Sequence, residues 1–207
     1  MGKLYTFESR QATTPIFDSV GVAVCKNRRT LDKGQGELDT GQYDERSQCF
    51  GASGAAPFYR RAMLKDVAID GEYFDEDFFA YREEVDLAWR SQLLGWTCAF
   101  APRAVGYHDR AYTPASRRRM PPFLRQHIVK NRYLLLLKND EPAHILRHLP
   151  HILWFEASLW GHSLLLEPYL VRAIWHVKQL ARRMLSKRRY TMSRRRVGHD
   201  DMLRWFV

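Results

Sequence analysis

Apolar positions follow two patterns along the chain: short runs in the first half and helical spacing in the second. Residues 16–25 (IFDSVGVAVC) have the β-branched and small apolar content of a strand. Residues 28–48 are polar and contain three glycines, which predicts a long loop of the kind that is often functional. Residues 57–64 then predict the start of a short helix.

Residues 83–94 carry a clear helical pattern. Val85, Trp89 and Leu93 form one apolar stripe, and acidic residues occupy the first turn, where they complement the helix dipole. Gly95 is a typical residue for the position just after a helix. This segment therefore predicts a helix that packs its apolar face against the core.

Two short strands are predicted after this helix, at 96–102 and 104–108, separated by Pro102. The order of strand, loop, helix and strand predicts an α/β fold. After Pro121 and Pro122 almost every segment is compatible with a helix. We therefore expect an α/β portion at residues 1–120. An α-helical, basic region is expected at residues 121–207.

The helical region is divided into segments by prolines at positions 142, 150 and 168. Its most hydrophobic segment, 152–167, would be about 24 Å long as a helix, less than the roughly 30 Å of a bilayer's hydrocarbon core. Its few polar residues fall on one stripe, which favours an amphipathic helix lying at a membrane surface. A helix buried in the protein explains the pattern equally well.

The formal net charge is +10, and residues 182–196 hold eight lysines or arginines and no acid. Such a segment is expected to meet an anionic membrane or nucleic acid, or to form a solvated face. It matches no nucleic-acid recognition motif, so we expect no nucleic-acid partner. The three cysteines are scattered and the N-terminus lacks an apolar signal core. These features predict a cytoplasmic protein without a disulfide framework or a cysteine-based zinc site.

Six acidic residues lie within positions 75–86, although the chain as a whole is basic. Glu84 stands among those at the predicted helix start, where a carboxylate can cap the helix or accept a proton from a substrate hydroxyl. The small residues at 49–56 would let a polar ligand approach the backbone closely. Arg60 and Arg61 follow them and could meet phosphate.

These segments, taken in order, resemble a known family. The run SGAAPFYRR, then YFDEDFFAYREEVDLAWR, then GW and a strand ending in His108 resemble the C-terminal half of family 2 glycosyltransferases of GT-A fold. The bacterial rhamnosyltransferase-like branch, which builds cell-surface polysaccharides, is the most similar. The resemblance covers about Leu4 to His108, and HIVKNRYLLLLKN continues in the same style. The motifs are specific in this combination and not singly.

The resemblance implies an inverting transfer of a sugar from a nucleoside diphosphate to an acceptor hydroxyl. Glu84 occupies the position of the general base, where the family commonly has an aspartate. His108 matches a histidine that helps hold a divalent cation, Mg²⁺ or Mn²⁺, against the departing diphosphate. The residues expected at the substrate are Gly54, Arg60, Arg61, Asp75, Asp77, Glu83 and Asp86.

The family's nucleotide-binding half, with its Asp-x-Asp metal motif, has no counterpart in these residues. We therefore expect a partial GT-A (Rossmann-like) catalytic domain with an unpaired sheet edge, N-terminally truncated relative to the family. The expected partners are a nucleotide-sugar donor, a saccharide or polyprenyl-linked acceptor and the inner face of the cell membrane. A non-catalytic protein that docks on a membrane is the alternative.

Two further expectations concern the helical region. His144, His148 and His151 have helical spacing, but Pro150 interrupts it and no carboxylate completes the set. A polar edge on an interfacial helix is therefore favoured over a metal site. If the region anchors the protein, truncation after Pro122 should release it from the membrane.

Overall fold

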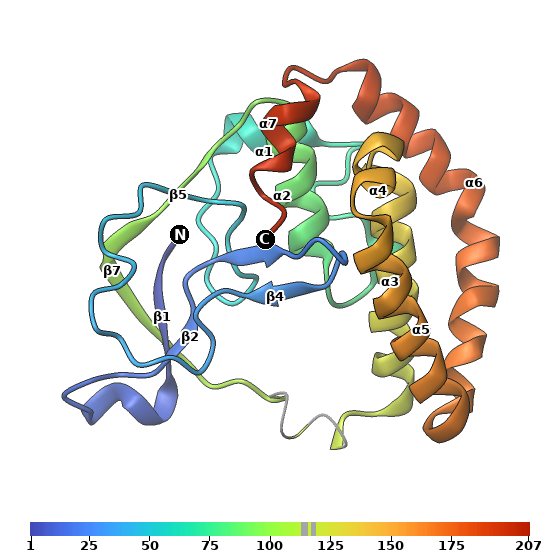
Figure 1. The fold of residues 1–207 in the computed structure, drawn as a ribbon. Helices are drawn as coiled ribbons and strands as arrows, with labels where there is room; N and C mark the ends of the chain where they lie inside the picture. The colour runs from blue at the N-terminus through green and yellow to red at the C-terminus, as the bar shows by residue number, and fades with distance from the viewer. Residues whose placement is uncertain (113–115, 117–118) are drawn as a thin grey trace.

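The computed structural model describes residues 1–112, 116 and 119–207. Its strands and long loops lie on one side and its long helices on the other, with α2 between them (Figure 1). The strands are β1 (Gly2–Thr6), β2 (Phe17–Ser19), β3 (Val22–Val24), β4 (Thr30–Asp32), β5 (Gln48–Cys49), β6 (Cys98–Ala99) and β7 (Ala101–His108). The helices are α1 (Arg61–Val67), α2 (Glu83–Leu93), α3 (Pro122–Asn139), α4 (Pro142–Arg147), α5 (Leu149–Leu166), α6 (Arg172–Ser193) and α7 (His199–Leu203).

The strands form small sheets rather than one large one. The largest has the order β2-β1-β7, in which β1 is antiparallel to β2 and parallel to β7. Two antiparallel pairs, β3-β4 and β5-β6, complete the strand pairing of the described residues. The mixed α/β class predicted from the sequence is confirmed, whereas its assignment to the GT-A fold stays a prediction.

Two strand predictions need correction. The single strand at 16–25 is two strands, because Gly21 takes a φ of 112° that turns the chain between β2 and β3. Pro102 does not separate two strands, since it lies inside β7. Among the described residues β7 pairs with β1 alone, and such an edge strand tolerates a proline on its unpaired side. Among the described residues β2 and β7 are thus the two edge strands of this open sheet, and whether either edge marks an absent half of a GT-A sheet stays a prediction.

The helix boundaries follow the local sequence signals. The helix predicted at 83–94 is α2, and Gly95 follows it with a φ of 80°. Pro142 and Pro150 lie in the first turns of α4 and α5, and Pro168 begins a short 3-10 helix (Pro168–Val171); at these positions the missing N–H costs no hydrogen bond. These predictions are confirmed.

One hydrophobic core joins the α/β portion and the helical region. Val22 and Trp89 pack in the same cluster as Leu134 of α3, Met184 of α6 and Phe206 near the C-terminus, all of them buried. The helical region is therefore no separable appendage. Truncation after Pro122 would remove much of this core, so release from a membrane would not test anchoring on its own.

A buried ion network reinforces this contact. The Nζ of Lys138 on α3 lies 2.6 Å from Oδ2 of Asp75 and 2.8 Å from Oδ2 of Asp86. The Nζ of Lys187 on α6 lies 2.6 Å from Oδ1 of Asp75 and 2.9 Å from Oδ2 of Asp77. The acid-rich segment therefore supplies counter-charges to the basic helices.

We expect Lys138→Ala to lower the free energy of unfolding by about 3–5 kcal/mol, because Arg90 and Lys187 then balance only part of the negative charge of the buried acids Asp75 and Asp86 and their neighbour Asp77. Denaturant unfolding followed by circular dichroism measures the loss. Lys178→Ala, at an exposed position of α6, is the matched control and should change stability by less than about 0.5 kcal/mol. Equal losses in the two variants would contradict the role of the network.

Candidate functional site

Glu84 lies in the first turn of α2 at the wall of a small cavity of about 190 Å³. No side chain of the described residues hydrogen-bonds or ion-pairs with its carboxyl group, unlike most carboxylates around it. Charged groups from distant parts of the chain converge here. The polar lining consists of Thr30, Asp32, Tyr81, Arg82, Glu84 and Arg110.

Burial raises the pKa of Glu84 to about 7, and the neighbouring carboxylate of Glu83 adds to the shift. The backbone N–H of Glu84 and the guanidinium of Arg82 counteract it only in part. A carboxyl group with this pKa is partly ionised at neutral pH and holds a proton well once it has accepted one. These are the properties required of a general base.

Arg82 brings an unsatisfied donor to the same cavity. Its Nη1 is buried and makes no hydrogen bond with the described residues. Burial, with the guanidinium of Arg132 nearby, lowers its pKa to about 10. A buried guanidinium N–H for which the described residues supply no acceptor is suited to bind an anionic or oxygen-rich ligand.

The turn at residues 79–82, which precedes α2 and positions Arg82 and Glu84, is strained. Phe79, Tyr81 and Arg82 have φ values of 64°, 69° and 73°, a region that non-glycine residues seldom adopt. Asn131 of α3 stabilises the turn, because its Nδ2 donates to the carbonyl oxygens of Phe78, Ala80 and Tyr81 at 2.9, 2.8 and 2.7 Å. Strain fixed by surrounding contacts is common at functional sites.

His108 lies at the end of β7 in a second polar cluster that adjoins the cavity. Its Nδ1 is 2.9 Å from Oδ2 of Asp18, whose carboxylate also accepts from Nε and Nη2 of Arg110 at 2.8 and 3.0 Å. Arg110 Nη2 reaches Oδ2 of Asp32 at 2.8 Å as well. Burial disfavours ionisation of Asp18, but Arg110 and His108 outweigh it and lower the pKa of this carboxyl.

The structure separates three of the other predicted site acids, Asp75, Asp77 and Asp86, from Glu84. Asp86 lies two residues further along α2, so it points to the opposite side of the helix, where it contacts Arg90, Lys138 and Asn139. Burial opposes its ionisation, yet these partners hold its pKa at about 2. Asp75 and Asp77 belong to the same ion network. Their contacts stabilise the fold and leave no oxygen directed at the cavity.

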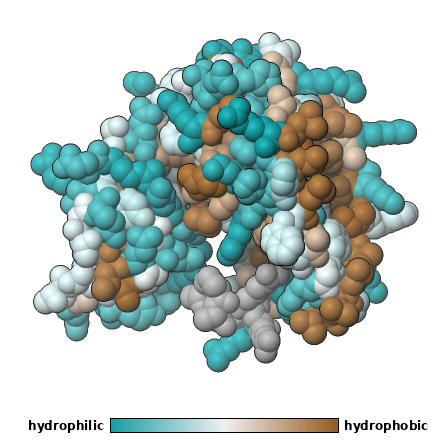
Figure 2. Space-filling model, viewed as in Figure 1, coloured by the Kyte–Doolittle hydropathy of each residue, from teal (hydrophilic) through white to brown (hydrophobic). Residues whose placement is uncertain are grey.

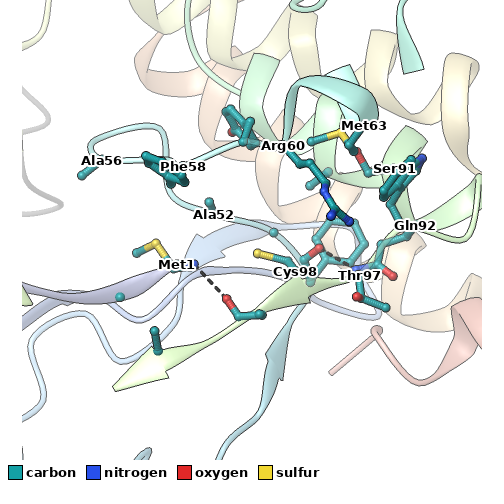
Figure 3. A pocket seen from close by; sticks show the side chains of 18 of the residues that line it. Met1, Ala52, Ala56, Phe58, Arg60, Met63, Ser91, Gln92, Thr97 and Cys98 are labelled. Atoms are coloured by element: carbon teal, nitrogen blue, oxygen red, sulfur yellow. Dashed lines mark hydrogen bonds between the residues drawn. The ribbon is translucent and has the colours of Figure 1, made fainter. Parts of the chain in front are cut away.

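The remaining predicted residues divide between two places. Gly54 packs against Glu84, since a Cβ atom there would lie 3.6 Å from Glu84 Cγ. Glu83 adjoins Glu84 and has a buried Oε2 with no hydrogen-bond partner in the described part of the chain, and burial raises its pKa. Arg60 lines a different, mainly apolar cavity of about 740 Å³ (Figure 3). Arg61 is exposed at the start of α1.

The larger cavity is lined mainly by apolar side chains, with Arg60, Ser91 and Cys98 among its polar groups. Figure 3 shows Arg60, Met63, Ser91 and Gln92 on one side of it and Phe58 on the other. The amide of Gln92 donates to a backbone carbonyl, and Glu84 does not reach the cavity. The small residues at 51–56 pass between the two cavities, as Gly54 contacts Glu84 while Ala52 and Ala56 line the larger one.

None of the protein-family models, curated proteins or solved structures compared with the chain matches it. The site is therefore interpreted from its geometry. Sequence reasoning singled out Glu84, Glu83 and Gly54, which the structure brings together. It missed Arg82 and the residues that hold the site from elsewhere in the chain, namely Asp18, Asp32, Arg110 and Asn131.

We expect Glu84→Gln to raise the free energy of unfolding at pH 8 by up to about 3 kcal/mol and to leave it unchanged at pH 4. The pKa of Glu84 is about 7 in the folded protein, against an ordinary value of 4.5. Below pH 4.5 the carboxyl group is protonated in both the folded and the unfolded state. The folded state then loses stability as the pH rises through 7, because ionisation is less favourable in the buried site than in the unfolded chain. Glutamine avoids this loss because it does not ionise. Denaturant unfolding at both pH values measures the difference.

Glu76→Gln is the matched control for this measurement, since Glu76 is exposed and its replacement should change the free energy of unfolding by less than about 0.5 kcal/mol. A gain from Glu84→Gln that is equal at pH 4 and pH 8 would contradict a raised pKa at Glu84.

Proposed function

We propose that the Glu84 cavity activates an acceptor hydroxyl for sugar transfer from a nucleoside diphosphate sugar. The observation that carries the proposal is the unpaired carboxyl of Glu84, with a pKa of about 7, beside the unpaired guanidinium N–H of Arg82. A proton acceptor and an oxygen-binding donor in one cavity are what this reaction requires. The resemblance of the sequence to family 2 glycosyltransferases points to the same reaction.

In the proposed reaction Glu84 takes the proton of the acceptor hydroxyl. The hydroxyl oxygen forms a bond to the anomeric carbon from the face opposite the diphosphate. The bond between that carbon and the diphosphate oxygen breaks, and its electron pair leaves with the nucleoside diphosphate. The configuration at the anomeric carbon inverts. Arg82 would donate to an oxygen of the sugar or of the leaving group.

The size of the cavity limits what it can hold. At about 190 Å³ it is smaller than the roughly 300–1,000 Å³ typical of sites that enclose a whole ligand. It is sufficient for the reacting end of an acceptor and too small for a nucleotide sugar. The proposal therefore places the nucleotide outside this cavity, on residues beyond those that line it.

A divalent cation at His108 does not fit the described contacts well. Nδ1 of His108 and both oxygens of Asp18 are already engaged, and Arg110 takes the place between Asp18 and Asp32 where a cation would lie. The imidazole of His108 has only its Nε2 left to bind a cation. The proposed mechanism accordingly assigns no step to a metal ion.

The second candidate function is a membrane-docking protein without catalysis, and the incomplete ligand set at His108 favours it. The two candidates differ in what they require of Glu84. Catalysis needs its carboxylate, whereas docking through the helical region does not. Activity assays of one variant therefore distinguish them.

We expect Glu84→Gln to lower the rate of sugar transfer by at least about 100-fold, because an amide cannot accept the proton. The assay measures release of nucleoside diphosphate from a panel of nucleotide sugars with lipid-linked saccharide acceptors. It uses the protein coded by the complete reading frame that contains these residues. Glu76→Gln is the control, and its rate should equal that of the unaltered protein.

Sugar transfer that survives in Glu84→Gln would contradict the assignment of the base. Absence of transfer from every donor, combined with membrane binding, would favour the non-catalytic function.

We further propose that α5 docks on an anionic membrane, where a lipid-linked acceptor would be met. Within α5 only Ile152 and Ser163 are buried, which argues against a helix enclosed by the protein. Leu153, Trp154 and Leu165 are 58%, 78% and 82% exposed. Figure 2 shows hydrophobic side chains gathered on the helical side of the molecule. Among the described residues no helix is both long and apolar enough to cross a bilayer.

The only carboxylate within α5 is turned away from this surface. Oε1 of Glu156 pairs with Arg132 of α3 at 2.8 Å, and its other oxygen accepts from the hydroxyl of Tyr133. Arg147 and Arg172 flank the helix and suit an anionic headgroup layer. An apolar face with basic ends is the pattern of a helix that lies in the membrane interface.

We expect the double variant Trp154→Glu, Leu165→Glu to bind anionic lipid vesicles at least about tenfold more weakly, because each large side chain contributes roughly 1.5–3 kcal/mol when buried. Vesicle co-sedimentation measures the binding. Leu38→Glu, at an exposed apolar position of the long loop, is the control. Equal binding by the double variant and the control would contradict docking through α5.

A further inference from the structure

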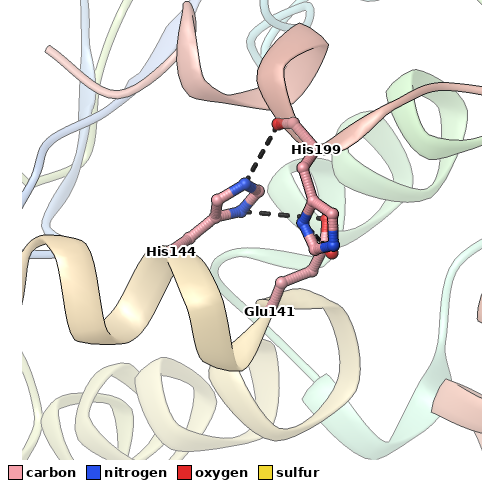
Figure 4. A group of neighbouring side chains, drawn as sticks. All are labelled: Glu141, His144 and His199. Atoms are coloured by element: carbon pink, nitrogen blue, oxygen red, sulfur yellow. Dashed lines mark hydrogen bonds and ion pairs between the residues drawn. The ribbon is translucent and has the colours of Figure 1, made fainter.

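A cluster of metal-ligating side chains lies far along the chain from Glu84, where the C-terminal segment meets α4. Glu141 at the start of α4, His144 on α4 and His199 on α7 place one ligand atom each within 4.8 Å of one another (Figure 4). Glu141 and His144 are buried, at 5% and 3% exposure, while the side chain of His199 is 58% exposed. The cluster thus has a buried floor and an open side.

The hydrogen bonds of His144 determine which ring nitrogen is available. Its Nε2 lies 3.0 Å from the backbone carbonyl oxygen of His199. A carbonyl only accepts, so Nε2 carries the hydrogen, and Nδ1 of the neutral ring presents a lone pair. Metal-bound histidines commonly donate their other N–H to a carbonyl in this way, which fixes the ring and its tautomer.

The lone pair of His144 faces another electron-rich atom. Nδ1 is 3.8 Å from Oε1 of Glu141, and this buried oxygen has no hydrogen-bond partner among the described residues. At 3.8 Å the two atoms are too far apart to share a hydrogen bond. Two ligand atoms on a tetrahedral Zn²⁺ ion lie about 3.4 Å apart, so a small movement would accommodate one.

The other oxygen of Glu141 is firmly held. Oε2 lies 2.6 Å from Nη1 of Arg195 and 2.6 Å from Nδ1 of His199. These contacts orient the carboxylate so that Oε1 points toward His144. They also bring the ring of His199 next to the same space, and a bound ion would take the place of the contact between its Nδ1 and Oε2.

We propose that Glu141, His144 and His199 form a binding site for a Zn²⁺-like divalent ion, with water as a fourth ligand on the exposed side. Two imidazoles and one carboxylate suit zinc and its neighbours in the transition series, whereas Mg²⁺ and Ca²⁺ prefer oxygen ligands throughout. The site is independent of the proposed sugar transfer. It would fasten the C-terminal segment, whose Met202 and Phe206 enter the main core, to α4.

The test is zinc titration of the metal-free protein by calorimetry, with Co²⁺ as a spectroscopic substitute. We expect one equivalent of Zn²⁺ to bind, a higher melting temperature on binding, and visible Co²⁺ bands typical of four-coordination. His199→Ala should weaken zinc affinity at least about tenfold and abolish the rise in melting temperature. Because His199 is exposed, this variant should fold, which circular dichroism verifies.

His176→Ala, at an exposed position of α6, is the matched control and should bind zinc like the unaltered protein. Equal zinc affinity in the unaltered protein and His199→Ala would overturn the proposal and show adventitious binding. No zinc binding at all would also overturn it.

Discussion

The structure depends on the burial of Lys138 and Lys187 against the aspartates of the acid-rich segment. Lys138 is completely buried between Asp75 and Asp86. Neither the ammonium group nor the two carboxylates would be stable in an apolar interior without the other. The acid-rich segment and helices α3 and α6 must therefore assemble together. The concentration of acids in a basic chain is explained largely by this assembly and only in one position by candidate chemistry.

The same assembly prepares the site. Asn131, two turns before Lys138 on α3, binds the carbonyl groups of the strained turn, while Lys138 binds Asp86 just inside α2. The start of α2 is thus held from both directions. Because Glu84 and Asp86 point to opposite sides of the helix, one acid neutralises the core while the other stays unpaired in the cavity. The residues that stabilise the fold and those that form the site are therefore neighbours in the sequence, but they are different residues.

Local features of this architecture could be predicted from the sequence, because they depend on a few adjacent residues. The ends of α2 follow from its first-turn acids and Gly95, and the starts of α4 and α5 follow from Pro142 and Pro150. The strand break at Gly21 depends on a backbone conformation that composition does not reveal. Partnerships such as Lys187 with Asp75 join residues 112 positions apart, so no spacing rule identifies them. His199 escaped notice beside His144 for the same reason.

The charges around Glu84 bear on how the proposed reaction could proceed without a metal ion at His108. Arg110 already offsets the carboxylates of Asp18 and Asp32, as a bound cation otherwise would. An additional divalent cation nearby would favour the ionised form of Glu84 and lower its pKa, which weakens a base. A departing diphosphate has the opposite effect, since its negative charge favours the protonated form. Proton acceptance by Glu84 would therefore become easier as the bond to the leaving group breaks.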